Sequence, residues 1–283
     1  MAAYILFLAI LFLFLAGFFV AATTYVLFWY EHQSRLETLF ANKKEAKSAA
    51  HKGFFSAIRS QLLTFILLPA GEVVQVKNKR TPQPPEQKKH PVIMVHGLFH
   101  NSSAWVFYKH WLKQAGFPDS TSFFYSSAKP FETVAEELDA YLDNLFTTHP
   151  DVKPILLGHS LGGLLIRNWV GHSEHSNKLA GVVTLGAPML GSKLATFSVI
   201  DLGQHLGYNG PLIQKIEKTE SIPQIPCYAL YSPVDNMVLP QESVSTAPAG
   251  WEAVQTDPVS HLAMLSHKPT ADLAINYIRS FHK

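Results

Sequence analysis

A serine flanked by glycines is the residue of this sequence best suited to chemistry. Ser160 lies in Gly158-His159-Ser160-Leu161-Gly162, which follows the apolar run 154–157 and precedes a segment with helical spacing. A Gly-x-Ser-x-Gly motif between a strand and a helix is typical of a nucleophile elbow, whose sharp turn exposes the serine hydroxyl. Glycines at 158 and 162 remove Cβ atoms where strand and helix would meet. We therefore interpret Ser160 as a nucleophile, and an ordinary glycine-rich turn is the alternative on the motif alone.

A loop earlier in the chain has the features of an oxyanion hole. Attack on a carbonyl needs two backbone N–H groups that point at the oxygen on which negative charge develops. One normally belongs to the residue after the nucleophile, here Leu161, and the other to a loop after an earlier strand. The apolar run 91–95 ends in His96-Gly97-Leu98. We therefore expect Leu98 and Leu161 to form the oxyanion hole, supported by His96 and Gly97.

Two later loops carry an acid and a base. Asp235 follows the apolar run 226–231, and His261 follows the alternating run 251–256. The chain order serine, aspartate, histidine is that of nucleophile-elbow hydrolases. We expect His261 to accept the serine proton and return it to the leaving group, while Asp235 orients the imidazole.

The 14 histidines of the chain leave rivals for these roles. His267 is the nearest rival base. Asp257 shares the loop of the preferred base, and Asp201 lies earlier, in an expected cap. His100 and His205 are expected near the site without an assigned role. Six other histidines are expected on the surface or next to a membrane: His32, His51, His110, His172, His175 and His282.

These segments together resemble the α/β-hydrolases of the bacterial lipase and esterase kind. The resemblance covers roughly residues 90–283 and includes the segment 184–192, which is similar to the strand-to-loop region after the elbow helix of such lipases. It implies a serine hydrolase that cleaves carboxylic esters, lipid or acyl esters above all, through an acyl-enzyme and without a cofactor. An acyltransferase with the same three residues, or a binding module without catalysis on the same fold, remains an alternative.

The sequence departs from that family at two points. Several of these lipases carry a calcium-binding aspartate two residues after the histidine, where this chain has Ala263. The resemblance therefore implies no metal site. Their disulfide is impossible because Cys227 is the only cysteine, and its apolar strand suggests a small core residue. A net charge of +2 gives no reason to expect a nucleic-acid partner.

The elements that must position these residues alternate along the chain. We predict strands at 91–95, 121–125, 154–158, 181–186, 225–231 and 251–256, and helices at 102–115, 131–146, 161–171 and 269–281. This alternation predicts an α/β fold with a mostly parallel sheet and helices on both faces. All candidate residues follow strands, so they should gather at the carboxyl ends of the sheet. Apolar residues at 190–222 predict a small cap that either covers an acyl chain or only packs on the domain.

The first 30 residues differ in kind from the rest. The segment from Tyr4 to Tyr30 has no charged residue and is longer than the ~20 residues that span a bilayer. Its aromatic ends suit the membrane interfaces. We predict a transmembrane anchor at 1–30, a single pass through a bacterial inner membrane, and a cleaved secretory signal is the alternative. Basic residues after the span favour a cytoplasmic hydrolase domain, namely Arg35, Lys43, Lys44 and Lys47.

A juxtamembrane segment at 31–90 links the anchor to the domain at 91–283. It begins with a polar, helix-prone stretch at 31–52. The apolar stretch at 53–68 is short for a second span, which favours an interfacial or domain-docking helix. A basic, proline-rich loop at 77–90 completes the segment. The expected partners are thus an ester or lipid substrate and the membrane.

Overall fold

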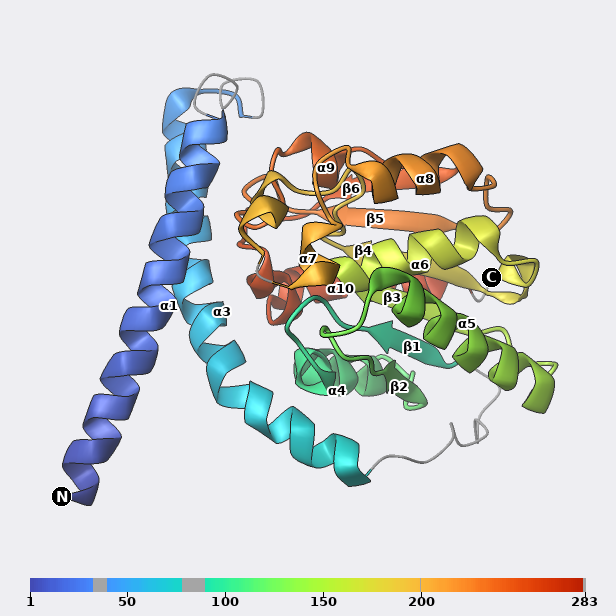
Figure 1. The fold of residues 1–283 in the computed structure, drawn as a ribbon, viewed down its shortest axis with the longest axis horizontal. Helices are drawn as coiled ribbons and strands as arrows, with labels where there is room; N and C mark the ends of the chain where they lie inside the picture. Colours follow the sequence, from blue (N-terminus) through green and yellow to red (C-terminus); the bar gives the residue numbers. More distant parts are fainter. Residues whose placement is uncertain (33–39, 78–89, 199, 282–283) are drawn as a thin grey trace.

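A single parallel sheet forms the centre of the α/β domain (Figure 1). The computed structural model describes residues 1–32, 40–77, 90–198 and 200–281. Every strand pair is parallel, and the order is β2-β1-β3-β4-β5-β6. The strands are β1 (Val92–Val95), β2 (Ser120–Phe123), β3 (Ile155–His159), β4 (Gly181–Leu185), β5 (Cys227–Tyr231) and β6 (Trp251–Gln255). The predicted α/β fold and its six strand positions are confirmed.

Helices cover both faces of the sheet, which explains why its central strands are apolar throughout. Alternate side chains of one strand enter different cores: Ile93 and Val95 pack in one, Val92 and Met94 in the other. The first core includes α5 (Phe131–Thr148), α6 (Leu161–His172) and α8 (Pro211–Thr219). The second includes α4 (Val106–Gln114) and α10 (Lys268–Ser280). Cys227 is a buried free thiol of the first core, as predicted.

Short elements lie in the connections between the strands and the longer helices. They are the 3₁₀ turns η1 (Ser102–Trp105), η2 (Ser176–Lys178), η3 (Lys193–Phe197) and η4 (Leu262–Leu265) and the short helices α7 (Asp201–Gln204) and α9 (Glu242–Ser245). The predicted cap at 190–222 contains η3, α7 and α8. Part of it packs on the domain, because Leu212, Ile213 and Ile216 of α8 belong to the first core.

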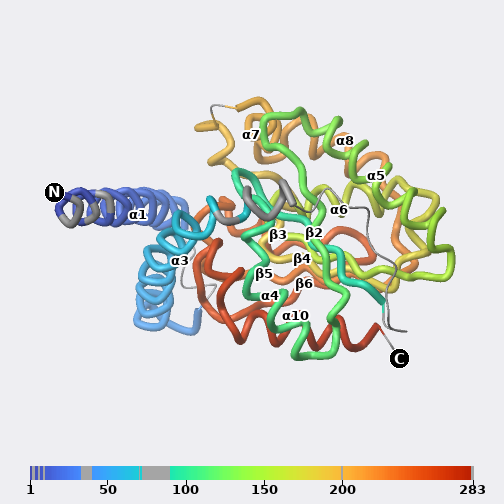
Figure 2. Tube along the Cα trace, turned by 90° about the horizontal axis from the view of Figure 1, so that it is seen from below, coloured from blue at the N-terminus to red at the C-terminus, as the bar shows by residue number. Residues whose placement is uncertain are grey.

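Two long helices stand side by side at one end of the domain (Figures 1 and 2). They are α1 (Ala2–His32) and α3 (Lys43–Lys77). The polar and apolar stretches expected before and after position 52 form one continuous helix from Lys43, with Pro69 inside it. By length and composition, Ile10–His32 can cross a membrane. Arg35 and the prolines of the loop before the domain, Pro82, Pro84 and Pro85, lie outside the described residues.

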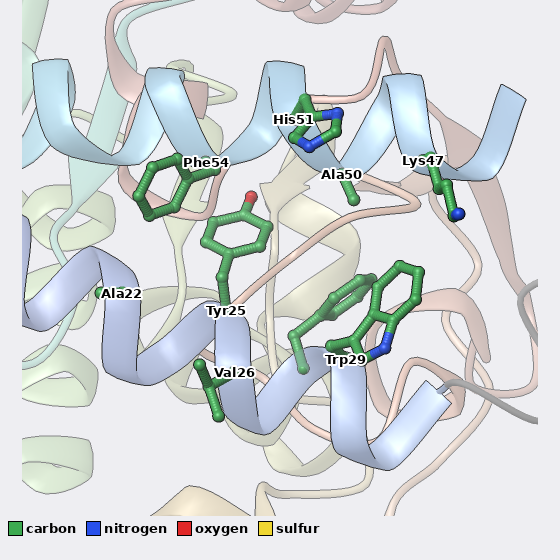
Figure 3. A pocket seen from close by; sticks show the side chains of 9 residues that line it. Ala22, Tyr25, Val26, Trp29, Lys47, Ala50, His51 and Phe54 are labelled. Atoms are coloured by element: carbon green, nitrogen blue, oxygen red, sulfur yellow. The ribbon is translucent and has the colours of Figure 1, made fainter. Parts of the chain in front are cut away.

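The two helices pack against loops that follow strands. Tyr25 Oη donates to the Val234 carbonyl at 3.0 Å, and the Ser260 N–H donates to Ser56 Oγ at 2.8 Å. The expectation for His32 is wrong: the residue is 2% exposed, and its Nε2 accepts a hydrogen bond of 2.8 Å from the Gln241 N–H. His32 is buried because the last turn of α1 packs against the distant residue Gln241, a tertiary contact. On another side, α1 and α3 border a groove with Trp29, Lys47 and His51 in its lining (Figure 3).

Candidate functional site

The predicted elbow lies between β3 and α6. Strand β3 ends at His159, helix α6 begins at Leu161, and Ser160 connects them with φ 53° and ψ −125°. This backbone conformation is one that side-chain-bearing residues rarely adopt, and it persists only where the surroundings hold it. The Ser160 N–H donates to the Leu185 carbonyl at 2.9 Å, and its carbonyl accepts from the Gly163 N–H at 2.9 Å. The turn is thus held from β4 and from α6.

The glycines of the motif are required by close backbone contacts. A Cβ atom at Gly158 would lie 2.7 Å from the Cα atom of Gly163, where strand and helix meet. A Cβ atom at Gly162 would lie 2.1 Å from the carbonyl oxygen of Val95. The contact of Gly162 is therefore with the end of β1, not with the strand before the elbow. Each glycine lets two backbone segments approach so closely that no side chain fits between them.

Asp235 and His261 meet at the carboxyl ends of β5 and β6. His261 Nδ1 donates to Asp235 Oδ2 at 2.7 Å, and both side chains are buried. Asp235 Oδ1 accepts from the N–H groups of Met237 and Val238, each at 2.9 Å. The carboxylate is thus hydrogen-bonded on both oxygens. The bond to Asp235 fixes the ring orientation of His261. It occupies Nδ1, so Nε2 is the ring nitrogen that does not bind the carboxylate.

Ser160 and His261 line one cavity of about 700 Å³, together with Gly97 and Leu98. This candidate cavity has the size of a typical small-molecule site. Much of its lining is apolar and comes from the predicted cap, through Leu194, Ala195, Phe197 and Leu206. The cap therefore supplies apolar side chains to the core and to the cavity, and Ala195 and Leu206 belong to both. Leu98 lines this cavity, and Leu161 directly follows Ser160 as the first residue of α6.

Buried histidines surround the elbow. His96 stacks on Tyr125 with 4.3 Å between ring centroids, and its Nδ1 lies 2.9 Å from the Gly97 carbonyl. Burial lowers the pKa of His96 to about 4, and burial also lowers the pKa of His100 to about 4. For His159, burial and then the neighbouring His261 hold the pKa well below its usual value. These rings are neutral at pH 7, so His96 can donate through Nδ1 to the Gly97 carbonyl.

The rival residues lie away from this arrangement. His267 caps the start of α10 and accepts from the Thr270 N–H at 3.4 Å. Asp257 is exposed, and Asp201 pairs with His205 on the surface of α7. Of the two histidines expected near the site, His100 lines the candidate cavity. Ala263 is buried, and no three His, Cys, Asp or Glu side chains come together as metal ligands among the described residues.

Two features of the site were not predicted from the sequence. Asn236 Oδ1 accepts from the His261 N–H at 3.1 Å, so Asn236 holds the backbone of that histidine. Its position next to Asp235 was the only available signal. The candidate cavity is also lined by Phe19, Val20, Thr23 and Thr24 of α1. No local pattern shows that an apolar N-terminal helix reaches residues more than two hundred positions away.

The family model described as "Alpha/beta hydrolase family" matches residues 92–276. A phospholipase of Bacillus subtilis, YtpA, is 32% identical over 74 residues, which are 26% of this chain and 27% of that protein. The chain thus aligns with about a quarter of that curated relative.

Two solved structures share the fold. The mature Bacillus licheniformis lipase BlEst2 superposes with a TM-score of 0.58 at 18% identity, over 70% of this chain and 96% of that one. Lipase B of Aspergillus fumigatus superposes with a TM-score of 0.58 at 16% identity, over 69% of this chain and 53% of that one. At such identities the likeness shows the fold alone.

Proposed function

We propose that this chain, which belongs to the alpha/beta hydrolase family, hydrolyses carboxylic esters with Ser160 as nucleophile. One observation carries the proposal: an elbow serine at φ 53° shares a cavity with a histidine whose other nitrogen is bound to a buried carboxylate at 2.7 Å. A nucleophile, a base and an orienting acid are the three groups that acyl transfer from an ester requires.

The proposed reaction begins when Ser160 Oγ attacks the ester carbonyl carbon. His261 Nε2 accepts the hydroxyl proton, and the alkoxide leaves as an alcohol after receiving that proton. Asp235 orients the ring and stabilises the imidazolium. The N–H groups of Leu98 and Leu161 bind the oxygen that becomes negative. Water, deprotonated by His261, then attacks the acyl-enzyme and releases the acid and Ser160.

The proposed substrates are lipid or other acyl esters. The apolar lining of the cavity supports this, because each buried methylene of an acyl chain contributes up to about 0.8 kcal/mol. The similar proteins named as lipases and a phospholipase support it as well. We further propose that α1 anchors the enzyme in the membrane as a single span. The basic residues after the span favour a cytoplasmic domain.

The test compares Ser160→Ala with Ser280→Ala in the full-length protein in mild detergent. Ser280 lies at the exposed end of α10, remote from the elbow in the sequence. With p-nitrophenyl butyrate, Ser160→Ala should lower kcat by about 10⁴- to 10⁶-fold, and Ser280→Ala should behave as wild type. Retention of a few per cent of wild-type activity in Ser160→Ala would exclude Ser160 as nucleophile. Product analysis with and without an added alcohol distinguishes hydrolysis from acyl transfer.

A further inference from the structure

The apolar helix α1 forms part of the wall of the candidate cavity. Phe19, Val20, Thr23 and Thr24 line the same space as Ser160 and His261. A helix that served only to hold the protein at a membrane would not need to reach the reacting groups. The contact therefore gives α1 a place beside the substrate.

Specific contacts seat α1 on the domain. Its buried positions Ala21, Tyr25, Phe28 and His32 recur at intervals of three or four residues and form one face of the helix. Tyr25 and His32 end in hydrogen bonds to the loop after β5, through the Val234 carbonyl and the Gln241 N–H. The helix is thus held in one register relative to the cavity.

A chain of hydrogen bonds connects α1 to the candidate base. Asn236 Nδ2 donates to Thr24 Oγ1 at 2.7 Å, and Asn236 Oδ1 accepts from the His261 N–H at 3.1 Å. Thr24 Oγ1 in turn donates to the Val20 carbonyl at 2.8 Å. The same asparagine therefore contacts both the helix and the histidine. The wall and the reacting groups are parts of one packed unit.

Exposed aromatic rings from three segments line the candidate cavity. Phe19 of α1 is 70% exposed, Phe99 of the loop after β1 is 57% exposed and Phe197 of η3 is 72% exposed. Large apolar side chains that gather in this way on a surface mark a site for another apolar surface. Because α1 is itself long and apolar enough to cross a bilayer, a lipid surface is the partner that fits.

The length of α1 places these aromatic rings at the edge of a bilayer. The exposed large apolar residues of α1 are concentrated between Tyr4 and Phe19, with only Val26, Trp29 and Tyr30 beyond. By composition alone the span could also run from Ile10 to His32, but Ala21, Tyr25, Phe28 and His32 are buried in the contact with the domain. The segment that remains for the bilayer, Tyr4 to Thr23, rises about 30 Å at 1.5 Å per residue, which equals the thickness of a hydrocarbon core. In Figures 1 and 2 the N-terminal end of α1 extends away from the domain. The segment of α1 that lines the cavity, Phe19 to Thr24, therefore lies where the span leaves the membrane on the side of the domain.

We propose that α1 is the acyl-chain wall of the cavity, along which a membrane-resident ester passes from the bilayer to Ser160. This inference rests on the proposed ester hydrolysis. Phe19, Val20 and Thr23 then contact the chain of the substrate, and the substrate class is an amphiphile whose acyl chain starts in the lipid. Specificity for chain length depends in part on the membrane helix, not only on the cap.

The test uses a single accessible thiol on either side of α1. Cys227 is the only native cysteine and is buried, so Thr23→Cys and Val26→Cys each add one exposed thiol to the full-length protein. Thr23 lines the candidate cavity, whereas Val26 is in the lining of the groove that α1 and α3 border. Both variants are reconstituted in lipid nanodiscs and treated with benzyl methanethiosulfonate, with the wild type as reagent control. The readout is the ratio of kcat/KM for p-nitrophenyl laurate to that for p-nitrophenyl acetate.

The adduct at position 23 should lower this ratio at least tenfold, and dithiothreitol should restore it, which separates blockage from unfolding. The adduct at position 26 should leave the ratio within twofold of wild type. An unchanged ratio with a complete adduct at position 23, as measured by mass spectrometry, would overturn the inference while leaving the hydrolase proposal intact. A wild-type protein that cleaves neither ester would overturn the hydrolase proposal and this inference with it.

Discussion

The strained backbone of Ser160 should have a measurable effect on the free energy of unfolding. Ser160→Gly and Ser160→Ala both remove the hydroxyl, so both should lack activity. They differ only in a Cβ atom at a residue with φ 53° and ψ −125°. Glycine adopts such angles without steric cost, whereas alanine keeps the strain. We expect the glycine variant to be the more stable of the two.

The expected difference follows from two opposing effects. A residue with a side chain in a sparsely populated backbone region costs about 1–3 kcal/mol. Glycine adds about 0.5–1 kcal/mol of conformational entropy to the unfolded chain. The net result is a gain of about 1 kcal/mol for Ser160→Gly over Ser160→Ala. At Ala140, exposed within α5, the same exchange of alanine for glycine should cost about 1 kcal/mol.

The assay is urea unfolding in mild detergent, followed by tryptophan fluorescence, for the two Ser160 variants, the wild type and Ala140→Gly. The free energy of unfolding should rise from alanine to glycine at position 160 and fall from alanine to glycine at position 140. This reversal of sign is the signature of backbone strain. If glycine is neutral or destabilising at position 160 as well, the elbow is not strained, and backbone strain does not expose the Ser160 hydroxyl.

Four further predictions concern the elbow, the buried histidines, metal and the membrane. Gly162→Ala should destabilise the protein by about 3 kcal/mol or more, since its Cβ would lie 2.1 Å from the Val95 carbonyl oxygen. The control Gly207→Ala should be tolerated, because its Cβ meets no atom closer than 3.9 Å. Equal free energies of unfolding for the two variants would refute the prediction for Gly162. His96 has a pKa of about 4 in the folded state and 6.5 in the unfolded state, so the unfolded state binds more protons between these pH values. The free energy of unfolding should therefore be full above pH 6.5 and fall by roughly 3 kcal/mol as the pH drops to 4. In urea unfolding at a series of pH values, His96→Gln should show a smaller dependence of this free energy on pH. Ester hydrolysis should survive EDTA, and reversible loss of activity with a calcium chelator would reveal a site that we have missed. The protein should stay in the membrane fraction after carbonate washing and lose that retention when residues 1–30 are removed, while protease digestion of the domain in spheroplasts would place it outside the cytoplasm.

The strands and the candidate residues were predictable because each depends on local patterns. The runs before Leu98, Ser160 and Asp235 are short and apolar, and the run before His261 alternates. Parallel strands bring their carboxyl ends to one edge. A residue at the end of each such run therefore had only one region of the fold to occupy.

Contacts between distant segments could not be predicted in this way. Thr24 meets Asn236, and His32 meets Gln241, across more than two hundred residues. Hydropathy indicates that α1 is apolar, but not which of its faces packs on the domain. The same holds for the cap, where Phe197 lines the cavity and Leu212 enters the core although both are large apolar residues of one stretch.

The most direct test of the central claim is covalent labelling of the nucleophile. Full-length protein in detergent is treated with a fluorophosphonate, digested and mapped by mass spectrometry. We predict one adduct per chain, on Ser160, that forms together with the loss of esterase activity and is absent from Ser160→Ala. An adduct on another serine, or full esterase activity after stoichiometric labelling of Ser160, would contradict the assignment.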